Sequence, residues 1–265
     1  MSSVSPSPDA TSQPVTPRLA SATALLRDRS GGGVEVFMVR RHVRSEFVPD
    51  VYVFPGGSVK EDDLATERTP GLCDGASDEE TALGLGFRAA AIRELFEEAG
   101  ALIALRGDAP LKLTAADLPR FAAHRAALNQ KTQTLQTVAK QEGLTLATAS
   151  LLRWAHWVTP EAMPKRFDTH FFLVEAPEGQ EPAHDALEVT HSVWIRPEDA
   201  LAGYKRGDFP IVFATIHQLE DLSGLASVAT ARARFTAKPI PTIRPRVVQR
   251  NGEPVILMPD EPDEA

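Results

Sequence analysis

The sequence has a single cysteine, only two tyrosines, and no long apolar run. Because Cys73 stands alone, the chain forms neither an internal disulfide nor a cysteine cluster for zinc, which suits a reducing compartment. No apolar stretch reaches the ~18 to 20 residues that a membrane-spanning helix needs, and the first residues lack the pattern of a secretory signal. The formal charge of −8 argues against a general nucleic-acid or membrane-surface binder. We therefore expect a cytoplasmic protein.

The composition changes at both ends of the chain. Residues 1–17 are rich in Ser, Pro and Thr and predict a disordered tail, because they carry too few apolar groups to bury. Residues 230–265 are rich in Pro and Arg and predict a C-terminal extension with one strand, Val255–Met258. The intervening residues 18–229 are long enough for one domain with a substantial insertion.

Within this domain, strand and helix patterns alternate along the chain. Strands are predicted at Arg18–Arg27, Val34–Arg41, Val51–Phe54, Ala101–Leu105, Trp154–Thr159, Phe167–Glu175 and Glu188–Ile195. Helices are predicted at Thr114–Asn129, Thr134–Glu142, Pro197–Tyr204 and Ile211–Leu222. A further helix ends at Ala99 and begins either near Asp78, where Ser77 and Glu80 match a capping box, or closer to Phe87.

Two segments of this domain are predicted insertions. Residues 62–78 are acidic and rich in turn-forming residues, which indicates an inserted loop. Residues 114–152 contain two of the predicted helices but no chemical motif, so they indicate a helical insertion.

The stretch Arg93–Gly100 reads R-E-L-F-E-E-A-G and carries the chemistry. At about 100° per residue, Glu94, Glu97 and Glu98 share one face of a helix, while apolar side chains occupy the opposite side. Three neighbouring carboxylates repel one another unless a cation joins them. Hard divalent cations such as Mg²⁺ prefer oxygen ligands of this kind.

Together with Phe54-Pro55-Gly56-Gly57, this stretch resembles the box of the Nudix hydrolases, written G-x5-E-x7-R-E-U-x-E-E-x-G-U with U a bulky apolar residue. Arg93 stands 36 positions after Gly57, against 14 in the family pattern, so twenty-two residues are inserted. The acid of the first half then comes from Asp63 or from the insert, for example Glu79 or Glu80. Ala101 departs from the pattern because it is small where the family has U.

An interrupted box is similar to the branch that includes the mammalian peroxisomal coenzyme A diphosphatase. The downstream stretches Arg166–Phe172 and Glu188–Leu201 also resemble that branch. The resemblance implies an α/β fold, the Nudix α/β/α sandwich with a mixed β-sheet. It also implies Mg²⁺ or Mn²⁺ as cofactor, held by Gly57, Glu94, Glu97 and Glu98.

The candidate catalytic residues are Glu94, Arg93 and Glu188. Arg93 is expected to orient carboxylates through a bidentate ion pair. The general base stays open between a glutamate of the box and a later acid, for which Glu188 is the first candidate and Asp185 the second. Candidate substrate contacts are Arg41, Arg44, Phe54 and Arg166. The histidines show no metal-ligand spacing along the sequence and are interpreted as ordinary residues: His156, His170, His184 and His191.

The resemblance implies hydrolysis of a nucleoside diphosphate linked to another group. Coenzyme A or acyl-coenzyme A, cut to 3′,5′-ADP and a 4′-phosphopantetheine product, is the leading substrate. ADP-ribose or NADH is the alternative within the same reaction class. The alternative from another class is a catalytically silent Nudix fold that senses a ligand or binds a partner. A small nucleotide is the expected partner, and a homodimer is left open.

Overall fold

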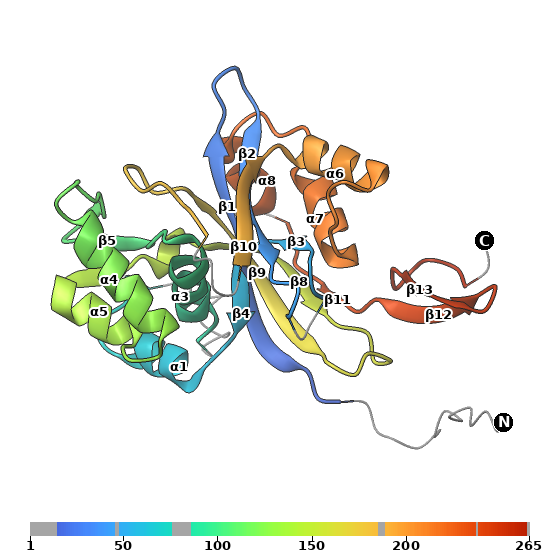
Figure 1. Cartoon of the computed structure of the whole chain (residues 1–265), viewed down its shortest axis with the longest axis horizontal. Helices are drawn as coiled ribbons and strands as arrows, with labels where there is room; N and C mark the ends of the chain where they lie inside the picture. The colour runs from blue at the N-terminus through green and yellow to red at the C-terminus, as the bar shows by residue number, and fades with distance from the viewer. Residues whose placement is uncertain (1–14, 46–47, 76–85, 185–188, 237, 264–265) are drawn as a thin grey trace.

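A computed structural model describes residues 15–45, 48–75, 86–184, 189–236 and 238–263. The chain forms a mixed β-sheet with helices on both faces (Figure 1), which is the predicted α/β/α sandwich. The main sheet has the strand order β10-β2-β1-β9-β8-β11, and β3 and β4 pair with β2 and β1. The β1–β9 and β8–β11 pairs are parallel and the others are antiparallel, so the sheet is mixed as expected.

The strands of the main sheet are β1 (Arg18–Asp28), β2 (Val34–Arg41), β3 (Tyr52–Val53), β4 (Gly56–Ser58), β8 (Leu152–Val158), β9 (Phe167–Glu175), β10 (Val189–Ile195) and β11 (Thr242–Ile243). Two small sheets comprise β5 (Ala104–Arg106), β6 (Ala109–Pro110) and β7 (Leu144–Leu146), and the hairpin of β12 (Arg246–Arg250) and β13 (Glu253–Leu257). The helices are α1 (Glu61–Arg68), α3 (Phe87–Ala99), α4 (Leu118–Asn129), α5 (Leu135–Glu142), α6 (Pro197–Arg206), α7 (Phe213–Leu222) and α8 (Val228–Thr236), with a 3-10 turn at Thr148–Ser150. None of the described helices is long and apolar enough to cross a membrane.

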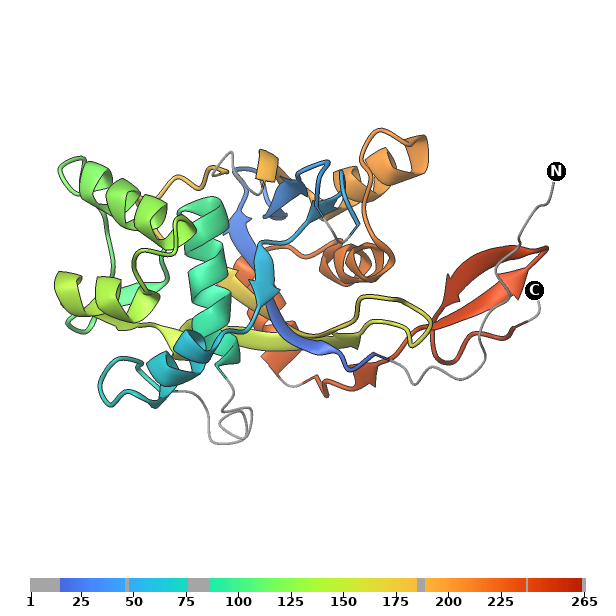
Figure 2. The same cartoon turned by 60° about the horizontal axis from the view of Figure 1, so that its bottom comes forward.

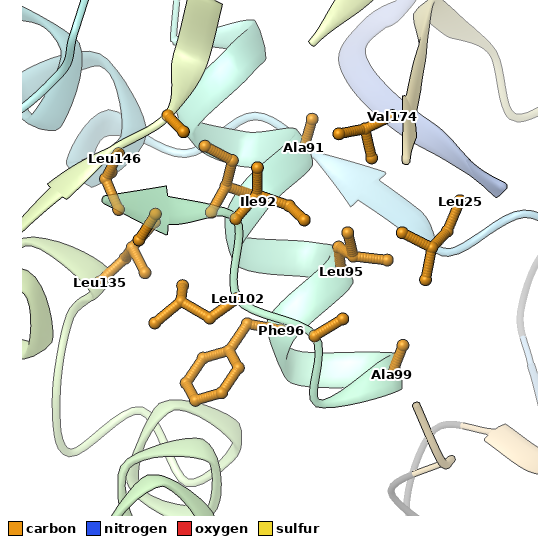
Figure 3. Close-up of a cluster of buried hydrophobic side chains, with 14 of the residues drawn as sticks. Leu25, Ala91, Ile92, Leu95, Phe96, Ala99, Leu102, Leu135, Leu146 and Val174 are labelled. Carbon is orange, nitrogen blue, oxygen red and sulfur yellow. The ribbon is translucent and has the colours of Figure 1, made fainter. Parts of the chain in front are cut away.

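Helix α3 is anchored to the sheet by its apolar face (Figure 3). Ile92, Leu95 and Phe96 are each at most 1% exposed, and they pack in a cluster that includes Leu25 of β1 and Val174 of β9. Burial of these three side chains contributes roughly 5 to 9 kcal/mol, at 1.5 to 3 kcal/mol for each. The helix is therefore held firmly enough to present its acidic face in a fixed position.

The described parts of both predicted insertions lie on the α3 side of the sheet (Figure 2). The first contains all of α1 except its first residue, so the prediction of a loop over this segment was wrong for residues 62–68. Its acidic first turn, with Glu61, Asp62 and Asp63, favours a helix N-terminus through the helix dipole. The second contains α4 and α5, as predicted, and α5 begins at the N-cap Thr134 and ends before Gly143.

The opposite face of the sheet is covered by α6, α7 and α8 (Figure 1). Helix α8 was not predicted, because all but its first two residues lie in the segment that composition assigned to an extension. Its buried Phe235 packs against Trp154 of β8, with ring centroids 5.1 Å apart. The packed core thus continues past the predicted boundary at residue 229. Of the predicted N-terminal tail, only residues 15–17 are described.

Candidate active site

Arg93 is the centre of the predicted acidic face. Its Nε and Nη2 atoms donate to the two oxygens of Asp63 at 2.7 and 2.8 Å. Its Nη1 atom donates to Glu94 at 2.5 Å and to Glu97 at 3.1 Å, and Nη2 also donates to the Ser58 carbonyl at 3.0 Å. These contacts use all five N–H donors of a guanidinium. Arg93 therefore positions carboxylates and has no donor left for a substrate phosphate.

Asp63 is the acid of the first half of the box that pairs with Arg93. It is 1% exposed, and besides Arg93 it accepts a hydrogen bond from the Lys60 backbone N–H at 2.8 Å. Burial lowers the pKa of the Arg93 guanidinium, but its hydrogen bonds to Asp63 and the charges of the nearby carboxylates more than offset this and raise the pKa. Glu79 and Glu80, the other acids considered for this role, lie outside the described residues.

Glu94 is packed directly on the backbone of Gly57. A Cβ atom at Gly57 would lie 2.6 Å from Oε1 of Glu94, so only glycine leaves room for the carboxylate there. Burial raises the pKa of Glu94, and the charge of Arg93 opposes this shift.

The other two glutamates line the same face. Glu98 accepts a hydrogen bond from the Gly56 backbone N–H at 2.9 Å. Glu97 lies 3.7 Å from the ammonium group of Lys60 and keeps 14% of its side chain exposed. Strand β4 and helix α3 thus bring Gly57 together with three carboxylates from positions that lie far apart in the sequence.

Both insertions hold the ends of α3. The N-terminus begins at Gly86, which has no capping side chain of its own. Instead the carboxylate of Glu67, on α1, accepts hydrogen bonds from the backbone N–H groups of Gly86, Arg88 and Ala89 at 2.8 to 3.0 Å. A carboxylate at a helix N-terminus satisfies unpaired donors and complements the helix dipole. The first insertion therefore supplies both this cap and the partner of Arg93.

At the C-terminus of α3, the capping group comes from the helical insertion. Arg125 of α4 donates to the carbonyl oxygens of Glu97 and Glu98 at 2.9 and 2.7 Å. Gly100 ends the helix in the left-handed region, with φ of 74°. Two of the three acidic residues are thus fixed through their backbone by a side chain from the insertion. Sequence reasoning missed Glu67 and Arg125, because nothing local marks contacts across 20 to 30 positions.

The predicted substrate contacts do not all lie at this face. Burial lowers the pKa of Arg41, which the negative charge of Glu98 opposes, so Arg41 is electrostatically coupled to the acidic face. Arg44 is exposed after the end of β2. Phe54 is 3% exposed and packs near Trp154 in the core on the other side of the sheet, so its prediction as a substrate contact was wrong.

Arg166 was also predicted as a substrate contact, and the structure gives it a different role. It is 8% exposed and donates to the carbonyl oxygens of Thr159 and Val15 at 3.1 and 2.8 Å. It therefore ties the segment before β1 to the β8–β9 connection. Glu188 and Asp185, the candidate later bases, lie outside the described residues.

Comparison with known proteins agrees with the geometry of this site. The family model described as the NUDT19 Nudix domain matches residues 71–222, which is more than half of the chain. The chain belongs to the NUDT19 Nudix domain family. It is a Nudix hydrolase, and the matched residues include the whole of α3 with its glutamates.

Curated relatives of this NUDT19-family chain carry related names. The chain is 29% identical over 190 residues to a putative nudix hydrolase 7 from Caenorhabditis elegans, covering 71% of this chain and 55% of that protein. It is 25% identical over 250 residues to the human acyl-coenzyme A diphosphatase NUDT19, covering 80% of this chain and 66% of that protein. The chain thus spans only 55% to 66% of the length of these two relatives.

A solved structure supports the fold of this family member. The NUDIX hydrolase from Alicyclobacillus acidocaldarius is similar with a TM-score of 0.72 and 27% sequence identity. The similarity covers 84% of this chain and 99% of that chain, so it includes most of the sandwich.

Proposed function

We propose that this chain is a Mg²⁺- or Mn²⁺-dependent diphosphatase that cleaves coenzyme A or acyl-coenzyme A to 3′,5′-ADP and a 4′-phosphopantetheine product. One observation carries the reaction type. Glu94 packs on Gly57, Arg93 binds Glu94 and Glu97, and Glu98 accepts a hydrogen bond from the Gly56 N–H, so three carboxylates line one face of α3 beside β4. The names of the NUDT19 relatives support the choice of substrate.

The residues at this face fit a hard divalent cation. The carboxylates of Glu94, Glu97 and Glu98 together with the Gly57 carbonyl are oxygen donors, which Mg²⁺ and Mn²⁺ prefer. The structure also leaves more negative than positive charge there, because Arg93 is shared between the box glutamates and Asp63. When bound, a divalent ion would neutralise the diphosphate and lower the pKa of a coordinated water.

The chain's own groups then have separate tasks in the proposed reaction. The oxygen of a water molecule forms a bond to one phosphorus while the bridging P–O bond breaks, and the second phosphate leaves with the electron pair. Glu94, oriented by Arg93 at 2.5 Å, is the described carboxylate best suited to take the proton from that water. To Arg41, whose pKa is lowered by burial and raised less by the charge of Glu98, we assign the task of offsetting the charge of the substrate phosphates.

The substrate is tested by a panel of diphosphates. Purified protein is incubated with Mg²⁺ and, separately, with coenzyme A, an acyl-coenzyme A, ADP-ribose and NADH, and the products are identified by mass spectrometry. We expect 3′,5′-ADP from the coenzyme A substrates at the highest kcat/KM. Preferred cleavage of ADP-ribose or NADH would keep the reaction but replace the substrate. Binding of a nucleotide without turnover would instead support a silent ligand sensor.

A further inference from the structure

A second group of metal-ligating side chains lies on the sheet, away from the acidic face of α3. His156 of β8 and the residues Asp168 and His170 of β9 each offer one ligand atom, and these atoms lie within 4.8 Å of one another. The sequence separates His156 from His170 by fourteen positions, but the antiparallel β8–β9 register places them directly opposite each other. Cross-strand pairing explains why spacing along the chain did not reveal the group.

The group lies in the same row of the sheet as the proposed diphosphatase site. Gly57 of β4 pairs with Ser21 of β1, Ser21 pairs with His170, and His170 pairs with His156. With ~4.8 Å between neighbouring strands, His170 and His156 lie about 10 and 14 Å from Gly57 along this row. Phe87, at the first turn of α3, covers His170, with ring centroids 4.1 Å apart. The two sites are therefore separate.

His170 is a buried imidazole without adequate hydrogen bonds. It is 5% exposed, and its Nδ1 atom has no hydrogen-bond partner among the described residues. Its Nε2 atom lies 3.8 Å from Oδ1 of Asp168, too far for a hydrogen bond. A buried polar atom left unpaired costs about 1 to 3 kcal/mol. The unpaired Nδ1 shows that hydrogen bonds within the described residues do not hold this ring, and Nε2 is the nitrogen that faces Asp168.

The other two side chains meet at the same point. His156 Nε2 lies 2.5 Å from Oδ1 of Asp168, and the two imidazole rings stack with centroids 4.0 Å apart. The other ring nitrogen of His156 is held by the Thr242 hydroxyl of β11 at 2.9 Å. A second partner of this kind fixes the tautomer and ring orientation of metal-binding histidines. Asp168 keeps 29% of its side chain exposed, which leaves an open side for a water ligand.

We propose that His156, Asp168 and His170 form a second metal site that takes Zn²⁺. Two imidazole nitrogens and one carboxylate oxygen, with water in the fourth position, are a donor set that zinc accepts in tetrahedral geometry. Bonds of about 2.0 to 2.1 Å place tetrahedral ligands roughly 3.3 Å apart. The contact between His156 and Asp168 opens by less than 1 Å to reach this value, and the His170–Asp168 pair closes by about half an ångström. The ion cross-links β8 and β9, and through Thr242 it is connected to β11.

The mixed nitrogen and oxygen donor set distinguishes this site from the acidic face of α3. Mg²⁺ prefers oxygen ligands alone, whereas imidazole favours zinc and its neighbours among the transition metals. Excess Mg²⁺ should therefore saturate the acidic face and leave the histidine site available. This difference allows each site to be measured without interference from the other.

The test is a titration of the full-length, chelator-treated protein with Zn²⁺ in the presence of excess Mg²⁺, followed by calorimetry. We expect one equivalent of Zn²⁺ to bind, and Co²⁺ to give the intense visible absorption of a tetrahedral nitrogen and oxygen site. His170→Gln and the isosteric Asp168→Asn should each weaken Zn²⁺ binding by at least about a hundredfold, because loss of a residue that only orients a metal ligand already costs about tenfold to a hundredfold. Asp168→Asn keeps the test valid if His170→Gln fails to fold.

Two control variants separate this proposal from the proposed function. Glu97→Gln should leave the stoichiometry and affinity of Zn²⁺ at the histidine site unchanged, because it alters only the acidic face. His184→Gln, a change in a histidine outside the group, should also leave Zn²⁺ binding unchanged. Absence of Zn²⁺ binding, or binding that survives both His170→Gln and Asp168→Asn, would overturn the proposal whether or not the protein hydrolyses coenzyme A.

Discussion

The buried pair of Asp63 and Arg93 offers a sharp test of how the interrupted box is assembled. In the wild-type protein, Oδ2 of Asp63 accepts hydrogen bonds from Arg93 Nη2 and from the Lys60 N–H. In Asp63→Asn the amide keeps one oxygen acceptor, but its NH₂ group takes the place of Oδ2 and faces these two donors. The side chains of Asp63 and Arg93 are 2% and 5% exposed, so water cannot replace the lost carboxylate. Removing one partner of a buried ion pair costs about 3 to 5 kcal/mol.

For a domain of this size, about 4 kcal/mol corresponds to a fall in Tm of roughly 8 to 16 °C. Calorimetry or circular dichroism during heating, in EDTA, measures the shift without a metal contribution. The matched control is Asp62→Asn, at the adjacent exposed position of the same helix, which should change stability by less than about 0.5 kcal/mol. If the two variants melt together, Asp63 is not the structural partner of Arg93, and the box is completed by another acid.

Three further predictions concern the contacts around α3 and the histidine group. Glu67→Gln should lower the free energy of unfolding by about 1 to 2 kcal/mol, because three backbone donors lose a charged acceptor. The control Glu61→Gln, at an exposed position, should not lower it. Urea denaturation compares the two variants, and equal midpoints would contradict the capping role of Glu67. Arg125→Gln should reduce kcat by about tenfold and change KM less, because the backbone of Glu97 and Glu98 loses its anchor. The control is Lys140→Gln, at an exposed position of α5. An unchanged kcat in Arg125→Gln would refute positioning by Arg125. Burial and the charges of His156, Arg153 and Arg88 lower the pKa of His170 to about 3, and Asp168 is the one nearby carboxylate among its described contacts. Below about pH 6.5 the unfolded chain therefore takes up a proton at His170 that the folded chain does not. The free energy of unfolding in EDTA should then fall by about 1.4 kcal/mol per pH unit as the pH is lowered from 6.5 to 3. His170→Gln should remove this part of the slope, and an identical slope in both proteins would contradict the lowered pKa.

Local sequence patterns were sufficient where a structural element is specified by its own residues. Apolar residues on one side of α3 and glutamates on the other predicted both its anchoring and its acidic face, and Gly100 marked its end. Strand β9 has the bounds that its alternation predicted, Phe167–Glu175. These features depend on periodicity and on capping residues, which the sequence displays directly.

Contacts between distant segments could not be predicted in the same way. Glu67 caps α3 from another helix, and it lies 21 positions before Arg88, so no pattern around Glu67 marks the contact. Phe54 was predicted as a substrate contact, but it directly follows β3 and its side chain packs in the core near Trp154. His156 and His170 meet only because of the β8–β9 register, which no local pattern states.

Helix α8 shows a further limit of composition. Its residues Val228–Thr236 stand next to a segment rich in Pro and Arg, and this neighbourhood suggested an extension outside the domain. Three of its residues, Val228, Ala231 and Phe235, recur at helical spacing and are each at most 1% exposed. The periodicity was present, but nine residues are too few to outweigh the surrounding composition.

The central claim is that the acidic face of α3 holds a divalent cation that hydrolysis requires. Its most direct test compares Glu97→Gln with the wild-type protein in coenzyme A hydrolysis, as a function of Mg²⁺ concentration. We predict that Glu97→Gln lowers kcat by orders of magnitude and shifts the Mg²⁺ dependence, while its Tm in EDTA stays near the wild-type value. The control Glu175→Gln, at an exposed position, should leave kcat, the Mg²⁺ dependence and Tm unchanged. Near-normal turnover by Glu97→Gln at the same Mg²⁺ concentration would contradict the assignment of this face as the catalytic metal site.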